Sequence, residues 1–252
     1  MVIHFALKRT LRVGSFLLLI LAYGMVCPSR KMDIILSVPI DSTEFKVVTA
    51  KLLGLQNKIK KAACQKGYCF NTHLNCLDTF HITLETAKRA AQDDYVKYEK
   101  CTEAMIRNAT SFDLTTPLKQ AKLGFMGGIN DWAVLELSVK REDVLPQLAR
   151  HIRKSFKKSN LKVGKYSEFI AHVSLGKFTQ DNKVSLPEDL SWVIHEPIEL
   201  PQGSFIVKNI LLQATRVDDL TGKMQRKQTF YSLPESDGTD SSYFPVGKEE
   251  SP

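Results

Sequence analysis

The alternation of apolar and polar residues divides the chain beyond its first 30 residues into strands and helices. An apolar run over 33–40 contains a proline near its end and predicts a short strand. Ser42 or Thr43 then supplies a helix cap, and apolar residues follow at spacings of three and four. These residues are Phe45, Val48, Leu52, Leu55 and Ile59. The stretch 65–79 combines turn residues with three cysteines and predicts a loop.

The remaining chain continues this mixture of periodicities. We expect a strand over 80–85, a helix over 92–108, strands over 113–125 and 132–139, a helix over about 143–157, and strands over 169–178, 203–217 and 225–233. The glycine-rich stretch 124–131 is typical of a hairpin turn and lacks the pattern of a phosphate-binding loop. The pattern predicts one mixed α+β domain over 33–233, followed by a disordered tail over 234–252.

Two of the expected strands carry nearly the same four residues. The first reads His-Ile-Thr-Leu at 81–84, and the second reads His-Val-Ser-Leu at 172–175. Alternate residues of a strand point to the same face. The histidine and the hydroxyl residue of each motif should therefore project together, while the two apolar residues enter the core. An internal duplication, with one motif in each half, explains the repeat.

His81, Thr83, His172 and Ser174 are a set of side chains suited to a phosphodiester. An imidazole titrates near pH ~6.5, so a neutral ring removes a proton from the attacking oxygen while a charged ring protonates the leaving oxygen. The hydroxyls donate hydrogen bonds to the non-bridging phosphate oxygens. This scheme requires no metal. A single motif would more often be a surface or core histidine, but the second copy favours catalysis.

The other histidines lack this context. His4, His73, His151 and His195 are interpreted as structural or solvent-facing residues. The sequence contains no nucleophile elbow, no metalloprotease motif and no nucleotide-binding phosphate loop. Its net charge of +8 favours anionic partners such as phosphates or nucleic acid, with a solvated basic surface as the alternative.

The double motif resembles the 2H phosphoesterase superfamily, which is named for two His-apolar-Thr/Ser-apolar motifs. The order of elements over about 33–233 is also similar to the branch found in the A-kinase anchoring protein with a nuclear-localisation-like domain. The resemblance implies an α+β, bilobal, LigT-like fold. In that fold, two pseudo-symmetric lobes with antiparallel sheets line a central groove.

The resemblance also implies an activity. It indicates a metal-independent phosphodiesterase, a phosphoric diester hydrolase that acts without a cofactor on 2′,3′-cyclic or 2′–5′ phosphodiesters of RNA or oligonucleotides, including 2′–5′ oligoadenylate. His81 would donate the proton and His172 would accept it, with roles that depend on reaction direction, while Thr83 and Ser174 hold the phosphate. The alternative is a module that binds AMP-like nucleotides without turnover. No protein partner is predicted.

The sequence departs from this branch just before the second motif. Ile170 and Ala171 stand where the branch often has a basic residue and a proline, which leaves the substrate preference open. Phe169 fits the branch pattern and is a candidate for stacking on a base, with core packing as the alternative.

The first 26 residues differ from the rest of the chain. They contain no acidic residue, and the apolar run 13–26 follows three basic residues. Such a run makes about 21 Å of helix, which is short of a ~30 Å hydrocarbon core. It predicts a signal peptide, with Ala-Tyr-Gly at 22–24 as the candidate cleavage site, or a membrane anchor, and therefore the secretory pathway. Mitochondrial and cytoplasmic locations are the alternatives.

The cysteines fit that compartment. Past the leader lie Cys64, Cys69, Cys76 and Cys101. In an oxidising compartment they would form one or two disulfides in any of several pairings, and the alternative is four free thiols. Asn108 begins a glycosylation sequon that is usable only in the secretory pathway.

Overall fold

The computed structural model describes residues 31–40, 45–65, 69–72, 80–107, 109–126, 132–165, 168–179, 204–217 and 223–235. Its elements, in chain order, are β1 (Lys31–Pro39), α2 (Lys46–Gln65), β2 (Cys69–Asn71), β3 (His81–Ala91), η2 (Gln92–Asp94), α3 (Tyr95–Ile106), β4 (Phe112–Asp113), α4 (Thr115–Lys119), β5 (Lys122–Met126), β6 (Trp132–Glu136), α5 (Val144–Lys158), β7 (His172–Thr179), β8 (Ile206–Val207), β9 (Asn209–Val217) and β10 (Met224–Ser232).

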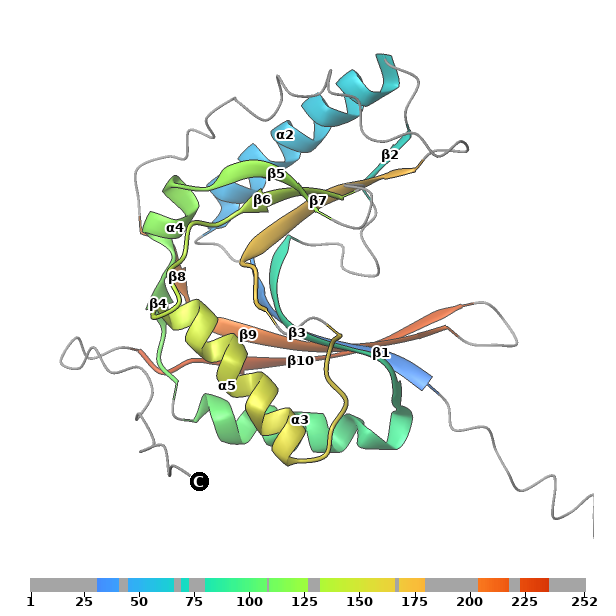
Figure 1. Cartoon of the computed structure of the whole chain (residues 1–252), viewed down its shortest axis with the longest axis vertical. Helices are drawn as coiled ribbons and strands as arrows, with labels where there is room; N and C mark the ends of the chain where they lie inside the picture. Colours follow the sequence, from blue (N-terminus) through green and yellow to red (C-terminus); the bar gives the residue numbers. More distant parts are fainter. Residues whose placement is uncertain are drawn as a thin grey trace, which may run out of the picture.

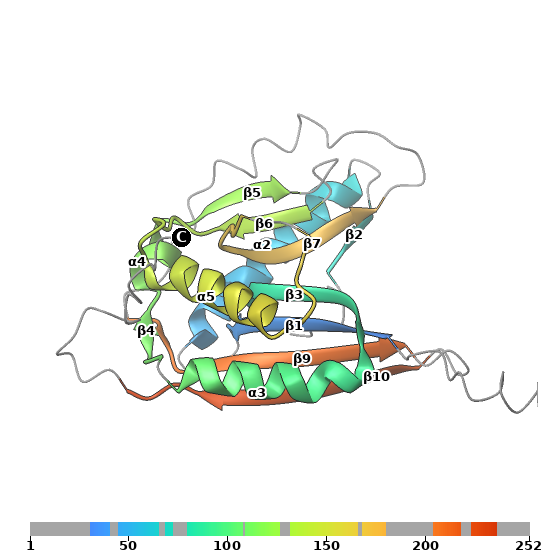
Figure 2. The ribbon, with the colours of Figure 1, turned by 60° about the horizontal axis from the view of Figure 1, so that its bottom comes forward.

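An antiparallel sheet runs through both halves of the molecule. Its strand order is β10-β9-β1-β3-β7-β6-β5, and β2 pairs with β7 at the side. Figures 1 and 2 show two lobes, one built on β10, β9, β1 and β3 with α3 and α5, and the other built on β7, β6, β5 and β2 with α2. The lobes meet where β3 pairs with β7. The two strands with the repeated motif therefore form the junction.

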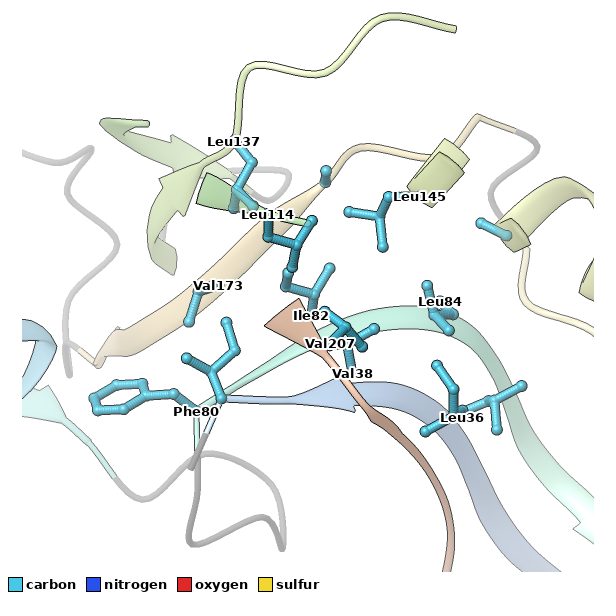
Figure 3. Packing of buried hydrophobic residues seen from close by; sticks show 14 of the residues in the cluster. Leu36, Val38, Phe80, Ile82, Leu84, Leu114, Leu137, Leu145, Val173 and Val207 are labelled. Atoms are coloured by element: carbon cyan, nitrogen blue, oxygen red, sulfur yellow. The ribbon is translucent and has the colours of Figure 1, made fainter. Parts of the chain in front are cut away.

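The hydrophobic core lies on one side of this junction. Ile82 and Val173 face each other across β3 and β7 and are fully buried. Figure 3 shows them among Val38 of β1, Leu145 of α5 and other apolar residues. The remaining apolar motif residues, Leu84 and Leu175, are buried as well. The prediction that the second and fourth motif residues enter the core is confirmed.

The predicted helices are present close to their expected bounds. In α2, Val48, Leu52 and Ile59 are buried, as their spacing predicted. The apolar face of α5 is buried in the same way, and two lysines in its last turn suit the negative end of the helix dipole. Both helices are stabilised mainly by burial of one apolar face.

The prediction of a single strand over 113–125 is wrong. The segment forms β4, then α4, then β5. Pro117 lacks a backbone N–H and lies in the first turn of α4, where N–H groups have no partner within the helix. The Asp113 carboxylate accepts a hydrogen bond from the Thr115 N–H at 2.7 Å and caps this turn.

Other boundaries also differ from the prediction: β3 continues to Ala91, beyond the expected end at 85, and β6 ends at Glu136, before the expected end at 139. The expected strand 203–217 is divided into β8 and β9 at Lys208, whose carbonyl accepts a hydrogen bond from the Leu233 N–H. The expected loop 65–79 contains β2, which pairs with β7. The strand expected over 169–178 begins only at His172. These details depend on pairing with distant segments, which local periodicity does not encode.

Several sequence predictions fall outside the described residues. They concern the leader 1–26, most of the turn 126–131, most of the tail 234–252, and Asn108. No helix in the described part of the chain is long and apolar enough to span a membrane.

Candidate active site

The two motifs lie side by side in antiparallel register. Ile82 of β3 is paired with Val173 of β7. Residues opposite one another in an antiparallel pair project from the same face of the sheet. On the face away from the core, His81 therefore lies opposite Ser174, and Thr83 lies opposite His172. Each imidazole is next to the hydroxyl of the other motif.

The neighbouring strands extend this arrangement into a row of polar side chains. Glu136 of β6 lies opposite His172, and Ser37 of β1 lies opposite Thr83. We call Glu136, His172, Thr83 and Ser37 the polar row. Directly opposite residues have Cβ atoms about 4.5–5.5 Å apart. The Glu136 carboxylate lies over Gly124 of β5, on the side of β6 away from β7.

Each motif strand contains a bulge directly after its hydroxyl residue. In β3 the register with β1 shifts at Leu84, and in β7 the register with β6 shifts at Leu175. A bulge increases the local twist and changes the direction of neighbouring side chains. The same irregularity at the same motif position supports the predicted duplication.

Glycine is required at the second bulge. A Cβ atom on Gly176 would lie 2.3 Å from Cζ of Phe70, which belongs to β2. The Phe70 ring also packs against Phe178, with the ring centroids 4.8 Å apart. The close approach of β2 to β7 therefore depends on the absence of a side chain at Gly176.

His172 has a defined tautomer. Its Nδ1 lies 2.8 Å from the carbonyl oxygen of Ile170, which accepts hydrogen bonds only. Nδ1 therefore carries the hydrogen in the neutral ring, and Nε2 has a free lone pair. This arrangement suits a proton acceptor. Ile170 contributes through its backbone carbonyl.

The motif hydroxyls are available to a ligand. Thr83 and Ser174 are partly exposed. Neither side chain forms a hydrogen bond in the described part of the structure. Within the same residues, no cluster of three or more His, Cys, Asp or Glu side chains is arranged to hold a metal ion.

A cavity of about 310 Å³ lies beside Thr83 and His172. Its walls come from β3, α5 and the segment that precedes β7, and they include the basic residues Lys88 and Arg150. Phe169 lines this cavity and also packs against the hydrophobic core. The core-packing interpretation of Phe169 is therefore confirmed, while stacking on a base stays a prediction.

A buried ion pair holds one wall of the cavity in place. The carboxylate of Glu85 lies 2.9 Å from Nη1 of Arg153 and accepts a hydrogen bond from the Gly164 N–H at 3.0 Å. Nη2 of Arg153 donates to the Gly164 carbonyl at 2.7 Å. We call Glu85, Arg153 and Gly164 the wall clamp. It fixes the chain between α5 and β7 against β3.

A tyrosine secures the same chain segment. The Tyr98 hydroxyl donates a hydrogen bond to the Lys162 carbonyl at 2.7 Å. Burial and nearby carboxylates raise the pKa of Tyr98 to about 12, so the hydroxyl keeps its proton at ordinary pH.

The other singled-out residues do not join the site. His151 is exposed on α5, while His4, His73 and His195 lie outside the described residues. Cys64, Cys69 and Cys101 are free thiols, so the structure contains no disulfide among these three cysteines. Cys76 also lies outside the described part of the chain.

Sequence reasoning missed two members of the polar row. Ser37 is the one polar residue in the apolar run 34–40, and Glu136 interrupts the apolar run 133–137. A polar residue within a short apolar strand was the available signal. Its significance depends on which strands are neighbours, and this cannot be read from local periodicity.

Known structures with the same architecture share little sequence with this chain. LigT from E. coli in its apo form is 14% identical, has a TM-score of 0.51, and is matched over 82% of this chain and 100% of its own length. TT0787 from Thermus thermophilus is 14% identical, has a TM-score of 0.53, and is matched over 81% of this chain and 98% of its own length. No protein-family model and no curated protein sequence matches the chain.

These similarities establish the fold. The chain has the bilobal α+β architecture of LigT, and the fold predicted from the sequence is confirmed.

Proposed function

We propose that the chain is a 2H phosphoesterase, related to the A-kinase anchoring protein branch, that hydrolyses a 2′,3′-cyclic or 2′–5′ phosphodiester of RNA or an oligonucleotide without a metal. The observation that carries this proposal is the pairing of Ile82 with Val173. It brings two imidazoles and two hydroxyls together on one face of the sheet. This is the set of groups that the chemistry requires.

His172 acts as the general base. Its Nε2 accepts a proton from water, because Nδ1 is occupied by the Ile170 carbonyl. The water oxygen attacks phosphorus, and the bond from phosphorus to the leaving ribose oxygen breaks. His81, as the imidazolium, donates its proton to that oxygen. Proton exchange with solvent then restores both rings.

Thr83 and Ser174 stabilise the transition state. Their hydroxyls donate hydrogen bonds to the non-bridging phosphate oxygens as negative charge builds up on them. Because each hydroxyl lies opposite a histidine, the phosphate is held between the base and the acid.

The adjoining cavity supports a nucleotide substrate. Its charged lining consists of Lys88, Arg150 and Arg153 against Glu85 and Glu168, and this positive excess favours an anionic ligand. Phe169 lines the same cavity. In this proposal its ring stacks on the base of the bound nucleotide.

A substrate panel tests this function. The purified protein, in EDTA, is offered 2′,3′-cyclic nucleotides and 2′–5′ oligoadenylate. We expect cleavage of at least one, and a decrease in kcat of about 10²–10⁴-fold for His81→Ala and for His172→Ala. His151→Ala is the matched control and should keep wild-type kcat, because His151 is exposed on α5. Equal rates in all three variants would contradict the proposal.

The alternative is an AMP-binding module without turnover. The observation that favours it is Ile170-Ala171, which replaces the basic residue and proline of the branch before the second motif. Calorimetry with AMP separates the two functions. Binding together with no turnover on the whole panel would support the module.

The same proposal includes entry into the secretory pathway through the apolar run 13–26. A fusion of residues 1–30 to a reporter should enter the endoplasmic reticulum. A cytosolic or mitochondrial reporter would contradict this location and, with it, the use of Asn108.

A further inference from the structure

Ser37 has an unusual hydroxyl for a residue in the centre of a sheet. Its side chain is 0% exposed, and its Oγ has no hydrogen-bond partner. Among the described residues, Thr102 is the only other one with a buried, unpaired side-chain oxygen or nitrogen. An unpaired buried polar group destabilises the folded state, so an alanine at this position is expected to stabilise the fold.

The strand register places this hydroxyl beside the site. Ser37 lies opposite Thr83 on one side and opposite Leu211 of β9 on the other. Thr83 is the only one of these two neighbours with a polar side chain. Thr83 lines the cavity, whereas Ser37 is closed to solvent and is not part of the cavity lining. The unpaired hydroxyl is therefore next to the phosphate-binding one and does not touch a ligand itself.

We propose that Ser37 is a positioning residue for Thr83. Its O–H donates to Oγ1 of Thr83 when a phosphate is bound. A threonine hydroxyl has one hydrogen and two lone pairs, so accepting from Ser37 leaves the Thr83 hydrogen for the non-bridging phosphate oxygen. A chain of two hydrogen bonds also polarises the second one and strengthens it. This inference rests on the proposed function.

In the second motif, no hydroxyl side chain lies opposite Ser174 on the outer strand. The residue opposite Ser174 on its outer neighbour is Val134, at the position that corresponds to Ser37. The pseudo-symmetric site is therefore unequal in its two hydroxyls. With Ser37 donating to it, Thr83 would have a fixed hydrogen direction, whereas no hydroxyl on the outer strand lies opposite Ser174 to orient it. The positioned hydroxyl should act mainly on the charge that develops in the transition state, and so on kcat.

Two variants with matched chemistry test the inference. Ser37→Ala and Thr102→Val each remove a buried, unpaired hydroxyl, and only Ser37 neighbours the site. We expect Ser37→Ala to lower kcat about tenfold with KM almost unchanged, and its melting temperature to be equal to wild type or higher. Thr102→Val should keep the wild-type kcat. A purely structural role for Ser37 would lower the melting temperature and leave kcat intact.

A double-mutant cycle with Thr83 gives the second test. In a Thr83→Ala background, Ser37→Ala should cause no further loss of kcat, because the group that it orients is gone. A Ser37→Ala enzyme with wild-type kcat, or the same tenfold loss in both backgrounds, would overturn the inference while leaving the proposed function in place.

Failure of the proposed function would give a different result. A wild-type protein that is inactive on the whole panel overturns that function, and AMP affinity measured by calorimetry then becomes the readout. Ser37→Ala should weaken AMP binding when Thr83 is present. The same substitution should leave AMP binding unchanged in the Thr83→Ala protein. Equal AMP affinity in wild type and Ser37→Ala would overturn the inference there too.

Discussion

At the scale of single residues, the site depends on which side chain faces which. The alternation in each motif was enough to predict that His81 and Thr83 project together and that Ile82 is buried. It did not predict that Thr83 would lie opposite His172, because this follows from the pairing of two strands far apart in sequence. Ser37 was overlooked for the same reason.

The two motif hydroxyls should differ in their contribution to the rate. We expect Thr83→Ala to lower kcat about 10²-fold, which is typical for loss of one preorganised donor, and Ser174→Ala to lower it less. The difference arises because only Thr83 has a buried hydroxyl opposite it on the outer strand. Steady-state kinetics on the cleaved substrate measures both.

Thr83→Ser is the control for this comparison. It keeps the hydroxyl and should retain kcat within a few-fold of wild type. Equal losses for Thr83→Ala and Ser174→Ala would show that the two hydroxyls act symmetrically.

At the scale of elements, bulges and short connections shape the site. Both motif strands were predicted, but their bulges were not, because a bulge is defined only relative to a partner strand. The interruption of the expected strand 113–125 could have been predicted from Pro117, because a proline within an expected strand argues against that strand. Gly176 had no local signal, because its role comes from the distant Phe70 ring.

Gly176→Ala should destabilise the protein by about 1–3 kcal/mol, because the new Cβ would overlap the Phe70 ring and displace β2 from β7. Urea unfolding measures this change. Gly54→Ala is the control, since its Cβ would meet nothing within 4 Å on the exposed face of α2, and it should stabilise by about 0.5–1 kcal/mol. An unchanged midpoint for Gly176→Ala would contradict the close approach of β2.

The wall clamp should contribute strongly to stability. Arg153→Met leaves the Glu85 carboxylate, whose side chain is 5% exposed, without its cation, and should cost about 3 kcal/mol. The exposed pair of Arg107 with Glu103 is the control, and Arg107→Met should change the free energy of unfolding by less than about 1 kcal/mol. Thermal denaturation of both variants measures the two changes in the free energy of unfolding. A small loss of stability in Arg153→Met, similar to that in Arg107→Met, would contradict a structural role for the wall clamp.

At the scale of the whole molecule, two similar halves meet at one strand pair. The element order predicted a mixed α+β domain, and the resemblance to the 2H phosphoesterases implied the bilobal form, which the similarity to LigT confirms. The strand order β10-β9-β1-β3-β7-β6-β5 was not predictable from local patterns, because most neighbours in it are distant in sequence. The junction of β3 and β7 places the two motifs side by side.

The rates of His81→Ala, His172→Ala and the double variant on one cleaved substrate test this junction most directly. Two groups that act on one phosphodiester in one step are not additive. We predict that each single variant loses about 10²–10⁴-fold in kcat and that the double variant loses little more than the worse single variant. A double loss equal to the product of the single losses, or full activity in either single variant, would contradict a shared active site.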